Sequence, residues 1–483
     1  MLKKIFKPLD LTEGKIWKVI ALFTLPIFLS FLLQQIYVIT DAIICGQFLS
    51  ANEVAGVNNT TNISFLVLQF AFGCTAGFSV VSANKIGQKD TDGARQSLLV
   101  QILLSTIISV LLTILGVASI KPLLALIGVK AEFNQEIFNS SYTYILIIFI
   151  GLFGQIFYNL ACCFLRSLGD SVTPLVFLLF SSVLNIALDL LFIASFNMGV
   201  MGAALATVIA QALAALGCFV YIFVKLKDYR FKKKDFKFSR SFVMKHLTLG
   251  LPLALQMSIL EFGLIVMQGT TIKFDILENG TLSYESQLGY GAACKLNGFI
   301  MAPFVALGSA MLSYAGQNLG AKNYDRIRRV VKDAHIIMLV LVLVFVGGGL
   351  LSTINGAYLN IFLSPDKIND RVIKFSNLYL YTNLPFYPFL GSLFILRNTM
   401  QGVEKPSYPF YAGVMELVAR LGVCWFLPTL VNGGPINANA SDLSYIVTSA
   451  ADLSSWILAD IPLVIGYLIF RHKLKINKEL ELY

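Results

Sequence analysis

The sequence predicts an all-α integral membrane protein with twelve transmembrane helices in two six-helix bundles. Of its 483 residues, 57% are hydrophobic and only 13% are charged, whereas a soluble domain averages about 25% charged residues. Long apolar runs recur along the chain, and about 20 apolar residues suffice for a helix to cross the hydrocarbon of a bilayer. In addition, the two halves of the chain resemble each other.

Twelve apolar runs fit in the chain with short connectors, so no soluble domain of any size fits beside them. An even number of spans places both termini on the same side of the membrane. The expected spans lie near residues 17–45, 61–83, 98–119, 140–163, 172–196, 200–224, 248–270, 290–313, 335–353, 375–396, 407–429 and 445–470.

Basic residues gather in alternate connectors. Lys85, Lys89 and Arg95 follow the second span, four basic residues between 322 and 329 follow the eighth, and the connector after the first span has none. The positive-inside rule therefore predicts a multi-pass protein of the cell (inner or plasma) membrane with both termini in the cytoplasm. The net charge of +10 then reflects topology. It does not indicate a nucleic-acid partner, because the basic residues form no patch interleaved with aromatics.

An internal repeat relates the two halves. Leu25-Pro26 resembles Leu251-Pro252, and two later motifs recur at similar offsets. The matched segments are 25–35 with 251–261, 84–89 with 317–322, and 165–174 with 400–409, at offsets of 226, 233 and 235. Six spans separate equivalent positions, so both halves enter the membrane in the same direction and a pseudo-twofold axis runs along the membrane normal. Parallel repeats of this kind are a transporter architecture.

The repeat also predicts the domain boundaries. We expect an N-terminal six-helix bundle over 1–224, a basic cytoplasmic linker over 225–247 and a C-terminal six-helix bundle over 248–483. The linker has three consecutive lysines at 232–234. Its charge is interpreted as an orientation signal that is attracted to anionic lipid head groups.

Ionisable residues inside spans point to candidate sites, because each costs roughly 2.5–3.5 kcal/mol on insertion scales. Five stand out: Asp41, Asp189, Glu261, Glu416 and Arg420.

Asn185 and Asp189 are four residues apart and share one helix face. Carboxylate and amide oxygens suit a hard cation such as Na⁺, or a proton's hydrogen-bond network. Asp41 lies toward the outer end of the first span, and two carboxylates in a low-dielectric pocket cannot both stay charged without a cation. The pair is thus a candidate proton or sodium switch. The alternative is that Asp41 lies at the water interface and Asp189 is a satisfied structural group.

Other polar residues in spans have two interpretations each. Glu261 occupies the repeat position of Gln35 and could bind a proton or a cationic substrate, or make a packing hydrogen bond. Glu416 and Arg420 are four residues apart, which favours a structural ion pair within one helix over a role in a cavity. Pro26 could be a hinge of the first span or a packing residue.

Several function classes are excluded. No Walker, GxSxG, HExxH or Gly-rich nucleotide motif is present in a suitable context, so we expect no enzyme activity, no cofactor and an ion gradient as the energy source. The seven cysteines lie mostly in spans without CxxC spacing, as small apolar residues do. A membrane-embedded enzyme would need paired Asp-rich metal motifs, and a channel would need a repeated pore-lining filter. Neither is found in the sequence, which argues against both classes.

Four motifs together resemble the multidrug and toxic compound extrusion (MATE) family. They are Leu25 to Asp41, the Gly-Gln-Lys-Asp connector at 87–90, Leu-Arg-Ser-Leu-Gly-Asp at 165–170 with Pro174, and Arg-Asn-Thr-Met-Gln-Gly at 397–402. The resemblance implies a V-shaped pair of six-helix bundles in a monomer. It also implies alternating access in the bilayer and export of small organic cations or amphipathic compounds against inflow of Na⁺ or H⁺.

The resemblance further implies a site. The bacterial DinF-like branch of the family has an N-terminal cation or proton site whose residues fall here on Asp41, Asn185, Asp189 and Thr207. Glu261 matches the acidic residue of helix seven in the NorM-like branch. The segment 389–392 lacks that branch's Asp, so a complete second site is not expected. The alternative within the superfamily is a flippase for a lipid or lipid-linked saccharide, which usually lines its cavity with more basic residues.

Overall fold

The computed structural model describes residues 8–132 and 134–480. In these residues the regular structure is helical, apart from one isolated β-bridge between Ile276 and Leu282. The α-helices are α2 (Ile16–Phe48), α3 (Ala51–Gly87), α4 (Thr91–Leu126), α5 (Gln135–Ile150), α6 (Leu152–Ser167), α7 (Val172–Asp189), α8 (Gly199–Lys225), α9 (Arg240–Ile272), α10 (Glu285–Gly320), α11 (Tyr324–Leu341), α12 (Gly347–Ser352), α13 (Leu359–Phe362), α14 (Asp370–Asn383), α15 (Tyr387–Gly402), α16 (Ser407–Asn432) and α17 (Asp442–Leu480).

Shorter helical turns join some of these elements. Two are π-helical, η1 (Leu190–Ser195) and η5 (Val342–Val346). The others are 3₁₀ turns: η2 (Lys227–Tyr229), η3 (Lys233–Phe236), η4 (Lys273–Asp275), η6 (Ile354–Gly356), η7 (Pro365–Lys367) and η8 (Leu384–Phe386).

The described part of the chain contains ten helices that are long and apolar enough to cross a bilayer. The pair α5 and α6, bent by 46°, is together long and apolar enough for an eleventh crossing if the two helices form one span. The span expected near 375–396 is interrupted, because η8 with Pro385 separates α14 (14 residues) from α15 (16 residues). Proline has no N–H to continue the helical hydrogen bonds, which accounts for the break. The predicted all-α membrane fold is confirmed.

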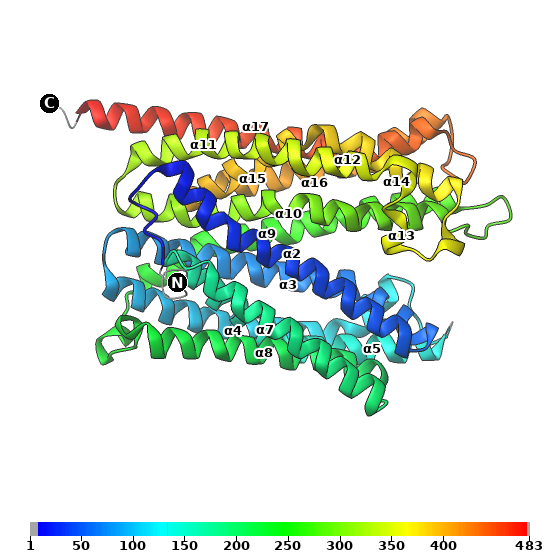
Figure 1. The fold of residues 1–483 in the computed structure, drawn as a ribbon, viewed down its shortest axis with the longest axis horizontal. Coiled ribbons are helices and arrows are strands. Elements are labelled where there is room, and N and C mark those ends of the chain that lie inside the picture. Colours follow the sequence, from blue (N-terminus) through cyan, green and yellow to red (C-terminus); the bar gives the residue numbers. More distant parts are fainter. Residues whose placement is uncertain (1–7, 133, 481–483) are drawn as a thin grey trace. The chain divides into compact units, whose positions relative to one another are not determined.

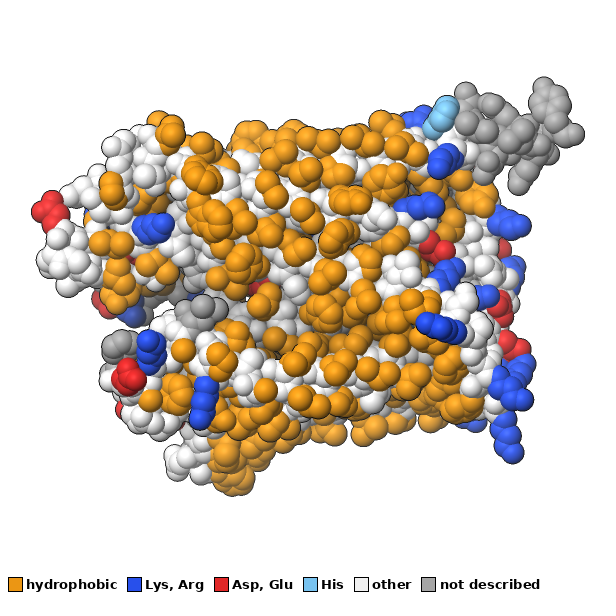
Figure 2. Space-filling model, turned by 180° about the vertical axis from the view of Figure 1, so that it is seen from behind, with side chains coloured by type: hydrophobic (Ala, Val, Ile, Leu, Met, Phe, Trp, Pro, Cys, Tyr) orange, Lys and Arg blue, Asp and Glu red, His pale blue; other side chains and the backbone are white. Residues whose placement is uncertain are grey.

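Lipid-facing surfaces are strongly apolar. Leu115, Leu343 and Leu430 are 63%, 76% and 76% exposed, and many other large hydrophobic side chains lie open on the same helices. In each unit of the chain, hydrophobic side chains cover the flanks of the helices and Lys and Arg side chains gather at the ends (Figure 2). Such continuous apolar surface is unfavourable in water and suits a hydrocarbon environment.

The chain forms two compact units. Unit 1 comprises Met1–Ser258, Leu312–Asn323 and Gln401–Glu404, and unit 2 comprises Ile259–Met311, Tyr324–Met400 and Lys405–Tyr483. In unit 1, α2 packs on α7 and α7 packs on α8; in unit 2, α16 and α17 pair along their lengths (Figure 1). The helices α9, α10 and α15 each contribute residues to both units. The domain boundaries at 224 and 248 stay a prediction.

Within unit 1, small residues let α3 and the first part of α9 approach closely. A Cβ added at Gly73 would lie 2.5 Å from the Cα of Ala254, and one added at Gly77 would lie 2.5 Å from the Cα of Gly250. Both helices therefore place small residues four apart in the contact, the pattern that favours tight helix packing in membranes.

The basic linker is anchored to unit 1 by a buried ion pair. Arg95 of α4 is 1% exposed and donates to both carboxylate oxygens of Asp235, with Nη2 at 2.9 Å from Oδ1. Arg95 Nη1 also donates to the carbonyl of Asp228 at 3.1 Å. The guanidinium holds the pKa of Asp235 below its ordinary value, chiefly through this hydrogen bond. The turns η2 and η3 are thus fixed on the end of α4.

The repeat is visible as reciprocal contacts in unit 1. A Cβ at Gly87 would lie 1.9 Å from the carbonyl oxygen of Gln317, and a Cβ at Gly320 would lie 1.9 Å from that of Asn84. Asn84 and Gln317 are equivalent in the repeat, as are Gly87 and Gly320, so the same contact occurs twice with the partners exchanged. Only glycine permits this backbone approach.

Candidate functional site

Helix α7 places two of the predicted residues on its buried face. Asn185 and Asp189 are 0% exposed, one helical turn apart. The opposite face is open to lipid, with Phe180 and Val183 at 52% and 61% exposure. The helix is therefore amphipathic in the sense suited to a membrane, with polar groups directed inward.

The other two predicted residues meet this face from neighbouring helices. The Asp41 carboxyl, on α2, shares a side-chain hydrogen bond with the Asp189 carboxyl. Thr207, on α8, accepts a hydrogen bond from Asn185 Nδ2 at 3.5 Å. Four residues that lie up to 166 positions apart in the sequence thus form one cluster inside unit 1.

Tyr37 completes the cluster and was not among the predicted residues. Its hydroxyl lies 3.3 Å from Thr207 Oγ1. It precedes Asp41 by four residues and so shares its helix face, a spacing that could have indicated it. Tyr144 of α5 and Cys45 of α2 also lie within the electrostatic reach of Asp41 and Asp189.

The geometry of the acid pair has a direct chemical consequence. Two ionised carboxylates only accept hydrogen bonds, so the Asp41 and Asp189 carboxyl groups can bond to each other only when one of them carries a proton. The oxygens of the two carboxyls, the Asn185 amide and the Thr207 hydroxyl form a donor set that also suits Na⁺. The arrangement can therefore hold one small monovalent cation in a buried, polar setting.

A π-helical turn begins directly after Asp189. The segment Leu190–Ser195 has π-helical hydrogen bonding, and Phe196 N donates to the carbonyl of Leu191. Single π turns inside α-helices widen the helix locally and occur often at functional sites. Hydropathy patterns gave no indication of this turn.

Unit 2 contains a different set of buried charges. The spacing of Glu416 and Arg420 had predicted an ion pair between them, but the two side chains do not pair with each other. Glu416 instead accepts a charge-assisted hydrogen bond from Arg397 of α15, and Arg420 contacts Asp452 of α17 at 3.0 Å. The reason is geometric, since both side chains are buried and their ion-pair partners are supplied by α15 and α17.

Two more acidic residues extend this set and were missed in the sequence. Asp452 accepts a hydrogen bond from Tyr379 at 2.8 Å. Asp460 bonds Ser392 and lies within electrostatic reach of Arg397 and Glu416. A count of ionisable residues in the predicted span 445–470 would have indicated both.

The remaining predicted residues have simple placements. Glu261 lies half-buried on α9, in the part of that helix that belongs to unit 2. Pro26 lies inside the continuous helix α2, where its carbonyl accepts a hydrogen bond from Ser30 Oγ at 2.9 Å. Among the described residues, no group of three or more His, Cys, Asp or Glu side chains could hold a metal ion.

Comparison with known proteins identifies the family. A family model described as MatE matches residues 26–191 and 280–426. The chain is 30% identical over 405 residues to "Probable multidrug resistance protein YpnP" of Bacillus subtilis (strain 168), covering 82% of this chain and 84% of the relative. It is 25% identical over 413 residues to "Probable multidrug resistance protein YoeA" of the same organism, covering 84% and 85%.

Solved structures show the same fold. A crystal structure of MATE in complex with MaL6 superposes with a TM-score of 0.82 at 21% identity and covers 97% of this chain and 98% of the other. The family model spans more than half of the chain, and the relatives cover most of its length. The chain therefore belongs to the MatE family, the multidrug and toxic compound extrusion transporters.

Proposed function

We propose that the protein exports small organic cations or amphipathic compounds in exchange for H⁺ or Na⁺ by alternating access. Members of the family are transporters, not enzymes, and need no cofactor. The names of the relatives, probable multidrug resistance proteins, support export of small organic substrates. The observation that supports ion coupling is the hydrogen bond between the Asp41 and Asp189 carboxyl groups.

In this proposal the acid pair is the coupling site. With a cation bound, the pair has a smaller net negative charge, and Asn185 and Thr207 stabilise it through oxygen contacts. Without the cation, two negative charges repel each other in a low-dielectric interior. Ion binding can shift the transport cycle only if the two conformational states bind the ion with different affinities. Pro26 offers a point at which α2 can bend, because its ring removes one backbone hydrogen bond.

The setting of the transporter follows from charge and hydropathy. We propose a monomer in the plasma membrane with both termini in the cytoplasm, and bundles 1–224 and 248–483 as the two moving parts joined by the linker 225–247. The basic connectors at 85–95 and 322–329 support this orientation.

The proposal is tested by efflux of a fluorescent organic cation from vesicles that contain the purified protein. A pH gradient and a Na⁺ gradient are imposed separately. We expect one of them to drive efflux. We also expect Asp41→Asn and Asp189→Asn to reduce gradient-driven efflux to background, because each variant removes one of the two carboxyl groups that bind the coupling cation. Asp228→Asn is the matched control, since Asp228 is exposed. Gradient-driven efflux at the wild-type rate in Asp189→Asn would contradict the assignment.

A further inference from the structure

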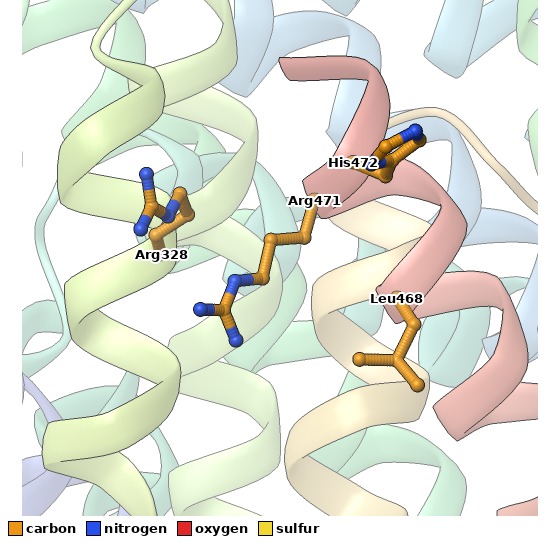
Figure 3. Close-up of a pocket in the computed structure, with 4 residues that line it drawn as sticks. All are labelled: Arg328, Leu468, Arg471 and His472. Carbon is orange, nitrogen blue, oxygen red and sulfur yellow. The ribbon is translucent and has the colours of Figure 1, made fainter. Parts of the chain in front are cut away.

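One cavity lies apart from the acid pair, between the ends of α11 and α17 in unit 2. It has a volume of about 400 Å³ and is lined by Arg328, Leu468, Arg471 and His472. Arg471 extends from α17 toward α11, where Arg328 lies opposite, and Leu468 lies about one turn before Arg471 on α17 (Figure 3). We call it the Arg328–Arg471 pocket.

The positive charge of this pocket is poorly balanced by the protein. Arg328 has one acidic partner, Asp325, at 3.7 Å on the same helix, and both side chains are substantially exposed. None of the carboxylates described in the structure lies within 4.0 Å of Arg471. Both guanidinium groups act electrostatically on Tyr467, so they converge on one region. Two facing cations favour an anion between them.

The pocket also borders the lipid-facing surface. Ile461, Ile465 and Leu468 are 51%, 50% and 52% exposed on α17, in successive turns that lead away from Arg471. On α11, Ile336 and Leu339 are 53% and 51% exposed beyond the charged first turns. A ligand that fits this surface has a negatively charged head and a long apolar body.

We propose that the Arg328–Arg471 pocket binds the phosphate head group of an anionic phospholipid. The acyl chains then lie along the apolar strips of α11 and α17. Guanidinium groups bind phosphate oxygens in pairs of parallel hydrogen bonds, and basic pockets between transmembrane helices at the cytoplasmic surface suit such head groups. A volume of about 400 Å³ is sufficient for a phosphoglycerol group. Inorganic phosphate shares the head-group chemistry but would not use the apolar strips.

The test measures lipid binding to the purified full-length protein in detergent by native mass spectrometry and by the shift in Tm. Phosphatidylglycerol, phosphatidylcholine and inorganic phosphate are added in separate arms. We expect phosphatidylglycerol alone to bind and to raise the Tm. The double variant Arg328→Gln/Arg471→Gln should bind it about thirty-fold more weakly, since each basic residue contributes about a five-fold factor at a membrane surface.

Two further variants keep the result interpretable. Arg329→Gln/Lys473→Gln removes the same charge from exposed neighbours outside the pocket and should bind like the wild type. Arg328→Lys/Arg471→Lys keeps the charge and should retain part of the affinity. The proposal is overturned if Arg328→Gln/Arg471→Gln and the control variant weaken phosphatidylglycerol binding equally. It is also overturned if phosphatidylcholine binds equally well, or if inorganic phosphate gives the same shift in Tm. None of these readouts depends on transport activity.

Discussion

The two units balance their buried charges in different ways. In unit 1, the carboxyl groups of Asp41 and Asp189 hydrogen-bond to each other, and the groups around them are the neutral Asn185, Thr207 and Tyr37. In unit 2, Glu416 and Asp452 each face an arginine. A fixed arginine neutralises a carboxylate permanently, whereas an acid pair needs a cation from solution. This difference explains why we assign ion coupling to the first cluster and a structural role to the second.

The largest effect that tests this comparison is expected for Asp452→Asn. The variant leaves the buried guanidinium of Arg420 without its carboxylate, which should destabilise the protein by about 3–5 kcal/mol. Gradient-dependent efflux should remain in the folded fraction. Thermal unfolding in detergent measures the first quantity and the vesicle assay the second.

A double variant serves as the control. Arg420→Gln added to Asp452→Asn removes both charges and should restore most of the lost stability. If Asp452→Asn instead kept its Tm but lost gradient dependence, the second cluster would couple ions too and the contrast between the units would fail.

A smaller effect is expected at the glycines that relate the two repeats. Gly87→Ala and Gly320→Ala each place a methyl group against a backbone carbonyl 1.9 Å away. Overpacking of this kind costs about 1–3 kcal/mol or more, and the reciprocal geometry predicts similar losses in Tm for both variants. Gly291→Ala is the control, because no atom lies within 4 Å of the added Cβ. Very unequal losses would show that the two contacts are not equivalent.

The smallest effect is expected for Tyr37→Phe. It removes the hydroxyl that contacts Thr207 at 3.3 Å, a hydrogen bond that contributes about 0.5–1.5 kcal/mol. The ion concentration for half-maximal efflux should therefore rise roughly two- to ten-fold, with the maximal rate little changed. Tyr142→Phe, on α5, is the matched control. An unchanged ion dependence would show that the Tyr37 hydroxyl does not contribute to ion binding.

Most of the fold was predictable because each helix that crosses the bilayer needs an apolar stretch as long as the hydrocarbon is thick. Helix starts were less predictable. The second span was expected from residue 61, whereas α3 begins at Ala51. Its polar first turns, with Asn58 and Asn59, lower the hydropathy there, but a capping box starts the helix. Ser50 Oγ accepts from Glu53 N at 3.3 Å, and Glu53 accepts from Ser50 N at 2.9 Å.

The candidate site was predictable only in part. The spacing of Asn185 and Asp189 shows that they share a face, and the carboxyl of Asp41 within a span made it a candidate partner, whereas Thr207 was added through the family resemblance. The partners of Glu416 and Arg420 could not be deduced from spacing, because their ion pairs join different helices. Spacing within one helix reports neighbours on that helix alone, and interhelical partners depend on the tertiary packing.

The anchoring of the linker by Arg95 has a practical consequence for protein engineering. Residues up to Asp235 are held on the end of α4 by buried charge-assisted hydrogen bonds, and α9 begins at Arg240. A fluorescent protein inserted among the three lysines at 232–234 would have to break that ion pair. The segment 236–239 lies beyond it and is the better insertion point for a reporter, or for a cut that expresses the two halves as separate chains.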